Sequence, residues 1–555
     1  MIRRIRGMLG PSARSRSYAS RWRLHELWFS SPLYRLTLVG RPPRRLARLA
    51  PEPWPGDASR GRAILAGKLV CAGQAIDAQR PDWYAAGVRP LALIELHGFG
   101  WLDDLAAEGS PDARQRARHL IADWLDNDKR WRPIVWAPEV LGRRVSAWLT
   151  HAPFLARGEG DPLGPRLLAS LAQQLKHLVR VAARGRAGSF RLEALKGMIV
   201  GAATGVGRDG DMRKALRLIE RELAQQLLVD GGHIERSPSA HLRALMALID
   251  IRAMLQAAGS SVPNALETAI ERMAPVLRFL RHGDGGLALF NDSNEEPAAL
   301  IDLALTRAGA KARPPTSLPD SGFERLLADR ALVIVDSGAP PPRGYDRYAH
   351  AGTLSFEMSV GKERLIVNCG AHPSSDPGWR RAQRYTAAHS TLILDDTNSA
   401  EVEADGGLGR RPVKVECARE ESDGNSWLTM SHDGYVATHG LIHRRRLYLA
   451  HDGADLRGED TLLGGGRSGV YDLRFHLHPE VQASVIQNGA AALLKLPSGA
   501  AWRLQVAGGQ LQIAESIYLG RRSEPRRSEQ LIVHGGFDGA KGTAIKWALK
   551  RVAKT

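Results

Sequence analysis

Three residues that can bind a metal ion or an anion lie at the ends of short apolar runs in the second half of the chain. His350 precedes the run LSFEM, Asn368 follows the run LIV, and His389 precedes the run LIL. Apolar and polar residues alternate in LSFEMS, which predicts a strand with one buried face. Imidazole and amide groups at neighbouring strand ends can hold a metal ion or position a substrate anion. Hydrogen bonding of both histidines to loops is the simpler alternative.

Strands of this kind dominate the chain after about residue 314, whereas helices precede them. Short apolar runs such as ALVIVDSG, RLIVNCG and QLIVHGG are separated by Gly, Asp, Asn and Pro, which is typical of an antiparallel β-sandwich. Residues 111–309 instead carry apolar side chains at helical spacing, as in GPRLLASLAQQLKHLVRVAARG. Consecutive antiparallel helices form a bundle, a solenoid or an incomplete toroid. A chain of 555 residues is too long for one core, so we expect several domains.

Positive charge is concentrated at the N-terminus. The chain has 77 Lys and Arg against 59 Asp and Glu, a net charge of +18. The first fifty residues hold twelve Arg and one acid, Glu26, and alone contribute +11. Such a segment can contact phosphate, lipopolysaccharide or anionic lipid. The helical spacing of apolar residues after Ser20, such as Trp22 and Trp28, favours the alternative of a helical extension docked on the body of the protein.

Other classes of protein find little support in the sequence. No apolar run is long enough to span a bilayer, and no apolar stretch of a standard secretory signal follows the first arginines. The cysteines are Cys71, Cys369 and Cys417, so neither a disulfide framework nor a zinc–thiolate site is expected. Specific nucleic-acid binding would rest on charge alone, without a recognition motif.

Several motifs together resemble the heparinase II/III family of polysaccharide lyases. The strongest are YAHAGTLSFEM, LIVNCGA and RYTAAHSTLILDD, between Tyr348 and Asp396, followed by FHLHP. SFRLEALKGMIVGA and VDGGHIERSPSAHLRAL match the helical half more loosely. The resemblance implies an α+β multidomain fold, with an N-terminal α/α incomplete toroid followed by a C-terminal antiparallel β-sandwich. We therefore predict an Arg-rich extension over residues 1–60, a toroid over 61–312 and a sandwich over 313–555.

The resemblance also implies a metal site. His350, Asn368 and His389 occupy what resembles the family's metal-ligand triad, with Asn368 where the family has an acid. One divalent metal such as zinc is the implied cofactor. Zinc prefers imidazole and carboxylate ligands, so an amide in place of the acid weakens its retention.

Family members cleave uronic-acid polysaccharides by β-elimination. The reaction needs a positive group on the uronate carboxylate, a base for the C5 proton and an acid for the leaving O4. The family's SP-x-Tyr-His motif is SPSAH here, with Ala240 in the Tyr position and His241 retained. Tyr348 replaces a family His and can supply a phenol. Arg191 or Arg236 would neutralise the carboxylate.

Three further residues are candidates for substrate binding. Arg384 and Tyr385 lie between two of the implied metal ligands, and Asn291 is expected to line a cleft between the domains. Simpler alternatives stay open: Arg384 in a solvated loop, Arg236 paired with its neighbour Glu235, and His241 packed among helices.

The sequence thus predicts a lyase-like protein that cleaves an acidic, uronic-acid-containing glycan. The alternative is a non-catalytic glycan-binding or cell-envelope protein that keeps the fold, which Ala240 and Asn368 favour. The resemblance implies the cell envelope or periplasm, whereas the lack of a recognisable signal peptide leaves the cytoplasm open. The sequence does not determine which polysaccharide is bound or the oligomeric state.

Overall fold

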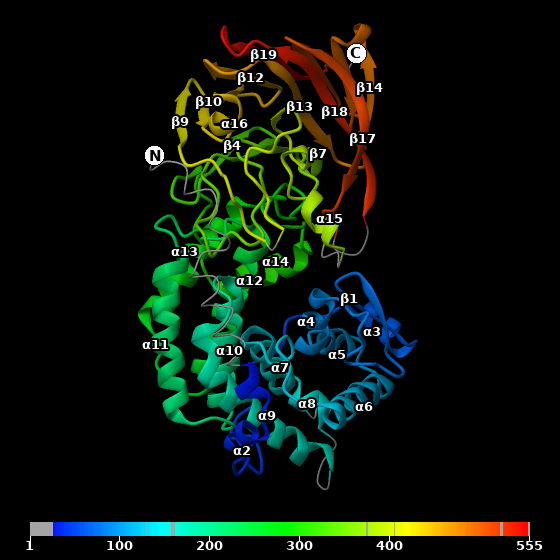
Figure 1. Cartoon of the computed structure of the whole chain (residues 1–555), viewed down its shortest axis with the longest axis vertical. Helices are drawn as coiled ribbons and strands as arrows, with labels where there is room; N and C mark the ends of the chain where they lie inside the picture. The colour runs from blue at the N-terminus through cyan, green and yellow to red at the C-terminus, as the bar shows by residue number, and fades with distance from the viewer. Residues whose placement is uncertain are drawn as a thin grey trace, which may run out of the picture. The chain divides into compact units, whose positions relative to one another are not determined.

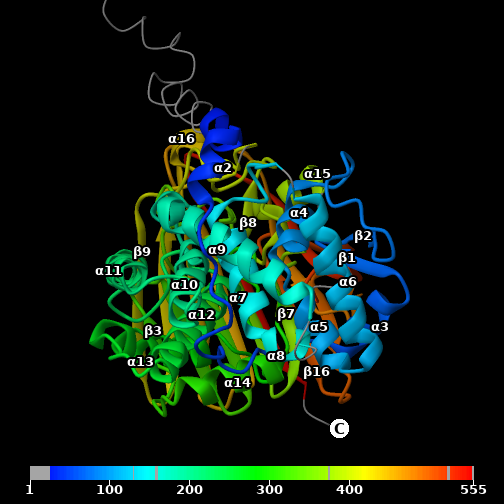
Figure 2. The same cartoon turned by 90° about the horizontal axis from the view of Figure 1, so that it is seen from below.

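The computed structural model describes residues 26–128, 130–156, 161–372, 376–404, 406–521 and 525–552 (Figures 1 and 2). Its contacts divide the chain into two compact units. The first comprises Met1–Arg186, Glu193–Leu218 and Ala253–Ser261, and the second comprises Ala187–Leu192, Ile219–Arg252 and Val262–Thr555.

The first unit is helical apart from one antiparallel hairpin, β1–β2. Its elements are α2 (Pro32–Leu38), α3 (Ala58–Leu65), β1 (Lys68–Cys71), β2 (Gln74–Asp77), α4 (Pro90–Gly98), α5 (Trp101–Glu108), α6 (Pro111–Asn127), α7 (Pro138–Thr150), α8 (Ala152–Leu155), α9 (Leu163–Val181) and η1 (Ala182–Arg184). Three helices contribute to both units: α10 (Ser189–Ala203), α11 (Asp209–Gln226) and α12 (Pro238–Ala257). The sequence predicted helices from about residue 111, and the structure adds the hairpin and α3–α5 before that point.

Helices α7 and α10 pack closely where two glycines meet. A Cβ atom on Gly142 would lie 2.3 Å from the carbonyl oxygen of Glu193. One on Gly197 would lie 2.5 Å from the Cα atom of Gly142. The two backbones therefore touch directly, which only residues without a side chain allow.

A buried arginine ties this layer of helices together. Arg144 in α7 donates through Nε to the side-chain oxygen of Gln174 in α9 at 2.7 Å. Its Nη1 donates to the carbonyl oxygen of His97 in α4 at 2.9 Å, and its guanidinium lies 4.6 Å from the ring centroid of Trp124. Because its hydrogen bonds are made inside the unit, the charge is retained without exposure to water.

The N-terminal extension docks as a helical segment over its described part. Residues 26–30 are helical, and α2 follows directly. The hydroxyl of Tyr34 in α2 lies 2.5 Å from Nδ1 of His177 in α9, and α2 lies beside α9 in both views (Figures 1 and 2). The prediction of a docked helical extension is confirmed for residues 26–38, whereas Trp22 lies outside the described residues.

The second unit combines helices with an antiparallel β-sandwich. Its helices include α13 (Asn264–Phe279), α14 (Ala298–Ala308), α15 (Pro377–Ala382), α16 (Val436–His439), η2 (Thr386–Ala388) and η3 (Gln487–Gly489). Its strands are β3 (Ser317–Leu318), β4 (Phe323–Ala328), β5 (Ala331–Asp336), β6 (Phe356–Val360), β7 (Glu363–Val367), β8 (Leu392–Leu394), β9 (Val415–Ser422), β10 (Asn425–His432), β11 (Leu441–Leu449), β12 (Asp455–Gly464), β13 (Gly469–Leu477), β14 (Gln482–Ile486), β15 (Ala491–Lys495), β16 (Ala501–Ala507), β17 (Gln510–Tyr518), β18 (Arg526–Phe537) and β19 (Thr543–Arg551).

Two sheets form the sandwich, and Figure 1 shows their later strands in yellow to red. One sheet has the order β14-β15-β16-β19-β12-β11-β10-β9. The other has the order β17-β18-β13-β7-β6-β5-β4-β3, with β8 also paired to β13. The rings of Phe356 in β6 and Trp547 in β19 stack at 5.6 Å between centroids, which joins the two sheets through the core.

The predicted strands at 354–358, 365–367 and 392–394 correspond to β6, β7 and β8. Strand β6 begins at Phe356 because Leu354 has a left-handed backbone, with φ of 64°. No helix among the described residues has the length and apolar character needed to cross a membrane.

Candidate active site

His350 and His389 belong to a closed chain of hydrogen bonds in the second unit. The backbone N–H of Asp292 donates to Nε2 of His350 at 2.9 Å. Nδ1 of His350 lies 3.0 Å from Nε2 of His389, and Nδ1 of His389 lies 2.8 Å from the carbonyl oxygen of Tyr385. Because the amide can only donate and the carbonyl can only accept, each neutral imidazole carries its proton on Nδ1. All four ring nitrogens are thus engaged.

Burial keeps both imidazoles neutral. Desolvation lowers the pKa of His350 well below its usual value, and the neighbouring His389 and Arg384 lower it further. Burial likewise lowers the pKa of His389 to about 4. At neutral pH neither ring is protonated to an imidazolium, so neither can act as a cationic proton donor. The pair positions the backbone at Asp292.

The amide of Asn368 is also engaged within the protein. Its Nδ2 donates to Oε1 of Glu357 at 3.2 Å, and its Oδ1 accepts the N–H of Ser390 at 3.0 Å. Within the described ranges, no group of three or more His, Cys, Asp or Glu could hold a metal ion. The three implied ligands, as hydrogen-bonded here, do not fit a zinc ion. Zinc binding stays a prediction for metal analysis, and no step below depends on a metal.

A strained turn holds the loops around this chain together. Asn291 and Asp292 have positive φ angles of 45° and 60°, which are uncommon for residues other than glycine. Oδ1 of Asn291 accepts the backbone N–H of His350 at 2.9 Å, and Nδ2 donates to the carbonyl oxygen of Arg236 at 2.9 Å. Asn291, predicted to bind substrate, therefore joins two other chain segments. Strain of this kind persists where the surroundings over-determine the backbone.

Arg236 is anchored in a closed site. Its guanidinium pairs with the carboxylate of Asp336 at 2.5 Å, and it does not pair with Glu235 as the simpler alternative had it. It also donates to four backbone carbonyl oxygens, those of Ser321, Gly322, Gly338 and Ala339. Through the ion pair and these carbonyls, Arg236 joins its own loop to residues 321–339, and neutralising a substrate carboxylate would require breaking these bonds.

Arg384 is likewise a clamp between loops. Its Nε donates to the carbonyl oxygen of Ala349 and its Nη2 to that of Gly407, each at 2.8 Å. Burial lowers its pKa to about 10, so the guanidinium remains charged at neutral pH. Tyr385, the next residue, is half-buried and contributes its carbonyl oxygen to the His389 ring.

His241 lies in a separate small cavity. Its Nε2 donates to the carbonyl oxygen of Met273 at 2.9 Å, while Nδ1 has no hydrogen-bond partner among the described residues. Burial lowers its pKa to about 4. The cavity, bordered also by His233 and Ser321, measures about 10 Å³, which is close to the space of one water molecule. This geometry suits packing around a water more than contact with a polysaccharide.

Tyr348 occupies a more open position. Its ring is half-buried. The guanidinium of Arg380 lies 5.3 Å from the ring centroid, that of Arg347 lies 5.9 Å away, and the ring of Phe190 is 5.9 Å away. Arg380 also pairs with Asp292 at 2.8 Å. Burial opposes the charge on Arg380, but the Asp292 carboxylate raises its pKa and keeps it cationic. Asp292 therefore links the histidine pair to the cluster around Tyr348.

Glu235 is a titratable group that the sequence indicated only as a possible ion-pair partner of Arg236. Burial raises the pKa of its carboxyl to about 7, Arg243 and the Ser189 hydroxyl oppose the shift, and Asp292 adds to it. The hydroxyl of Ser189 donates to Oε2 at 3.0 Å, and Phe190, the next residue, contacts Tyr348. A carboxyl that titrates near neutral pH can accept or donate a proton. Its position next to Arg236 in the sequence gave no signal of this environment.

Arg191, the remaining predicted catalytic residue, pairs with Glu222 at 2.8 Å. Both residues influence Tyr345, whose pKa is raised by burial and by the Glu222 charge and lowered by Arg191. The structure thus gathers Tyr348, Arg191 and the chain of His350 and His389 into one region of the second unit. The side chains of His241 and Arg236 instead line one small cavity, and Asn291 connects the backbone of Arg236 to that of His350.

Comparisons with known proteins agree with this fold. Residues 310–548 match the family model described as heparinase II/III-like, C-terminal. A crystal structure of heparinase III superimposes with a TM-score of 0.73 at 12% identity and covers 97% of this chain and 91% of that chain. Heparan sulfate lyase HepC from Pedobacter heparinus superimposes with a TM-score of 0.58 at 16% identity, covering 98% and 91%. The predicted α/α toroid followed by an antiparallel sandwich is confirmed, and the chain belongs to the heparinase II/III-like family.

A curated relative matches over nearly its whole length. FtsZ-localized protein C of Caulobacter vibrioides (strain NA1000 / CB15N) is 32% identical over 556 residues, which cover 94% of this chain and 93% of the relative. The relative's name records a cellular position and no reaction.

Proposed function

We propose that this protein acts on an acidic, uronic-acid-containing glycan and cleaves it by β-elimination at the cluster around Tyr348. The observation that carries the proposal is the half-buried Tyr348 ring with the Arg380 and Arg347 guanidiniums 5.3 and 5.9 Å from it. Cations beside a phenol combine recognition of a carboxylate with a group that can transfer a proton.

The chemistry assigns a role to each group. A guanidinium on the uronate carboxylate makes the C5 proton more acidic, because it stabilises the negative charge that develops as the proton leaves. Glu235 in its ionised form accepts the C5 proton, since its pKa of about 7 leaves both forms present at neutral pH. The C4–O4 bond breaks, a C4–C5 double bond forms, and the Tyr348 phenol donates a proton to O4. His350 and His389 act as positioning residues, because their bonds fix Asp292 and hence Arg380.

A substitution test follows from these roles. The protein is incubated with a panel of uronic-acid polysaccharides, and the ultraviolet absorbance of unsaturated products is recorded. We expect product with at least one polymer, and a loss of about 100-fold or more in turnover for Tyr348→Phe. Tyr448→Phe is the matched control, because Tyr448 lies on strand β11 and its hydroxyl donates to Asn425. Absence of product across the panel, or full activity of Tyr348→Phe, contradicts the proposal.

A second candidate is a non-catalytic protein that localises with FtsZ. Its support is the relative named FtsZ-localized protein C, together with the engagement of every ring nitrogen of the histidine pair. Two results together favour this candidate. A fluorescent fusion of the protein colocalises with FtsZ, and the purified protein cleaves none of the polysaccharides in the panel. Fractionation of the same cells tests the cell-envelope or periplasmic position that the family resemblance implied.

A further inference from the structure

Large apolar side chains gather on the outside of the N-terminal helical segment. Five of them between Leu27 and Val39 are 48–69% exposed, namely Leu27, Trp28, Leu33, Leu36 and Val39. Single exposed apolar residues are ordinary, but several on consecutive helical turns mark an interaction surface. We call these five residues the α2 patch.

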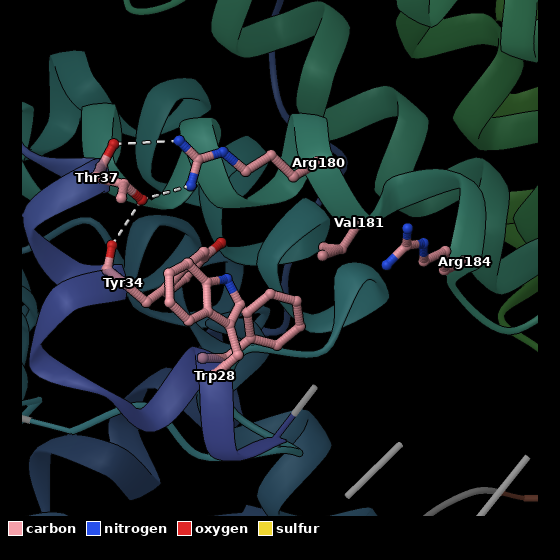
Figure 3. A pocket seen from close by; sticks show the side chains of 7 residues that line it. Trp28, Tyr34, Thr37, Arg180, Val181 and Arg184 are labelled. Atoms are coloured by element: carbon pink, nitrogen blue, oxygen red, sulfur yellow. Dashed lines mark hydrogen bonds between the residues drawn. The ribbon is translucent and has the colours of Figure 1, made fainter. Parts of the chain in front are cut away.

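A hollow of about 410 Å³ opens beside the α2 patch (Figure 3). Three aromatic side chains line it, Trp28, Phe29 and Tyr34, together with the arginines Arg180 and Arg184. This volume lies within the range of sites that accept small ligands or peptide side chains. All lining residues are described, and they include two guanidiniums and no carboxylate.

The walls of the hollow are held in place by their own contacts. Arg180 donates through Nη1 to the hydroxyl of Thr37 at 2.7 Å and through Nη2 to the carbonyl oxygen of Thr37 at 3.2 Å (Figure 3). The ring of Tyr34 lies 4.8 Å from that of Phe29 and 5.8 Å from that of Trp28. A site ordered before binding loses less entropy when its ligand arrives.

Charge indicates what the hollow accepts. Residues Met1–His25, which precede the segment in the sequence, contain seven Arg and no Asp or Glu. Because these arginines carry the same charge as the two guanidiniums that border the hollow, residues 1–25 are disfavoured as its occupant. An acidic ligand with an apolar group matches both the cations and the aromatic walls.

We propose that the hollow and the α2 patch bind an acidic peptide segment of a partner protein. One apolar side chain of the peptide enters the hollow and packs on the aromatic wall that Trp28 and Tyr34 form together, and the peptide's carboxylates pair with Arg180 and Arg184. The leucines of the α2 patch cover the flanking apolar residues of the peptide. A concave site in which Thr37 holds the Arg180 guanidinium suits a discrete side chain better than a flat anionic lipid surface, which is the rival in the experiment that follows. This binding does not depend on the lyase proposal.

The test selects peptides on the full chain. A randomised peptide library is selected in parallel on the wild type and on the Arg180→Gln/Arg184→Gln double variant. Peptides specific to the wild type are expected to carry Asp or Glu next to Phe, Leu or Trp. The Kd of a labelled selected peptide should rise about tenfold or more in the double variant, because two charge-assisted contacts are lost. Arg166→Gln, on the same helix α9 but in an exposed pair with Asp126, should leave the Kd unchanged.

A second variant distinguishes loss of peptide contacts from local unfolding, which Arg180→Gln could also cause because Arg180 holds Thr37. Leu33→Asp removes no hydrogen bond of the hollow, and its charge should repel the acidic peptide and raise the Kd by a similar factor. Selection of the same peptides by the wild type and the double variant overturns the proposal, as does enrichment of basic peptides or of none. Binding to phosphatidylglycerol vesicles that requires Arg180 and Arg184, without peptide binding, overturns it in favour of a lipid surface.

Discussion

The histidine pair and the Tyr348 cluster are neighbouring regions of the second unit with opposite character. In the first, each ring nitrogen of His350 and His389 has a partner and both rings are buried. In the second, Tyr348 is half-buried beside two cations, and the carboxyl of Glu235 titrates near neutral pH. The two histidines at positions that match the family's metal ligands thus serve as a hydrogen-bonded scaffold, whereas the proposed function assigns proton transfer to the neighbouring cluster.

Physical reasons separate the two regions. A polar group that is buried and fully bonded rigidifies the fold but has no capacity left for a ligand. A carboxyl whose pKa lies near the working pH, as that of Glu235 does, has both protonation states present, which general acid–base catalysis requires. We therefore expect substitutions among closed, fully bonded groups, which include the Arg236–Asp336 pair, to lower stability. Substitutions in the open cluster should change activity, and Glu235, which is also desolvated, should affect both.

The largest loss of stability is expected for Asp336→Ala. It leaves the Arg236 guanidinium buried without its counter-charge, which costs about 3–5 kcal/mol in the free energy of unfolding. Urea unfolding measures this. Asp455→Ala is the control, because it breaks pairs with two exposed cations, Arg457 and Lys550, and should cost under about 1 kcal/mol. Equal effects of the two substitutions would show that Arg236 is not in a closed site.

His389→Ala should lower the free energy of unfolding by about 2–3 kcal/mol, because Nδ1–H of His350 and the carbonyl of Tyr385 lose their partner. The same urea titration measures it. His534→Ala removes an exposed histidine paired with Asp472 and serves as the control. A change no larger than that of the control would contradict the closed hydrogen-bond chain.

Glu235→Gln should change how stability depends on pH. The carboxyl titrates at about 7 in the folded protein against an ordinary value of 4.5. The folded state therefore favours the protonated form, and wild-type stability falls as pH rises from about 4.5 through about 7. Below pH about 4.5 both proteins should be similarly stable, whereas above the folded pKa the Gln variant should be more stable by roughly 1–3 kcal/mol. Parallel stability curves between these limits would rule out the raised pKa.

The same substitution tests the catalytic role of Glu235. If its carboxylate is the base, wild-type turnover should increase with pH through about 7, and Glu235→Gln should abolish this rise along with most activity. A pH profile of glycan cleavage provides the measurement, and an unchanged profile would assign the base elsewhere.

The smallest effect on stability is expected for Arg347→Gln. Arg347 is exposed, so its removal should change the free energy of unfolding by no more than about 0.5 kcal/mol. It should nevertheless weaken glycan binding several-fold, because a cation beside Tyr348 is lost. Titration of a cleavage-resistant acidic oligosaccharide measures this. An unchanged affinity would mean that Arg380, and not Arg347, recognises the glycan carboxylate.

Much of the fold was accessible from local pattern. The alternation in LSFEMS and the helical spacing over 111–309 correctly predicted strand β6 and the helices. The expectation of one buried face was wrong for β6, because its polar residues Glu357 and Ser359 are buried as completely as its apolar ones. The hairpin β1–β2 escaped prediction, since strands of four residues carry too short a pattern. The residues of the site were less accessible. Arg236 was predicted to neutralise a substrate carboxylate, with pairing to Glu235 as the simpler alternative, yet it pairs with Asp336, which is distant in the sequence.

The sequence by itself determined the order of the helical and β parts, the resemblance to a lyase family and the residue types at the family positions. These follow from short-range periodicity and from motifs that are contiguous in the chain. Only the tertiary structure decided that His350 and His389 bond to each other, that Arg236 forms an ion pair with Asp336 and that Glu235 titrates near neutral pH. Hydrogen-bond partners and desolvation depend on which distant segments pack against a side chain, and no local pattern encodes them.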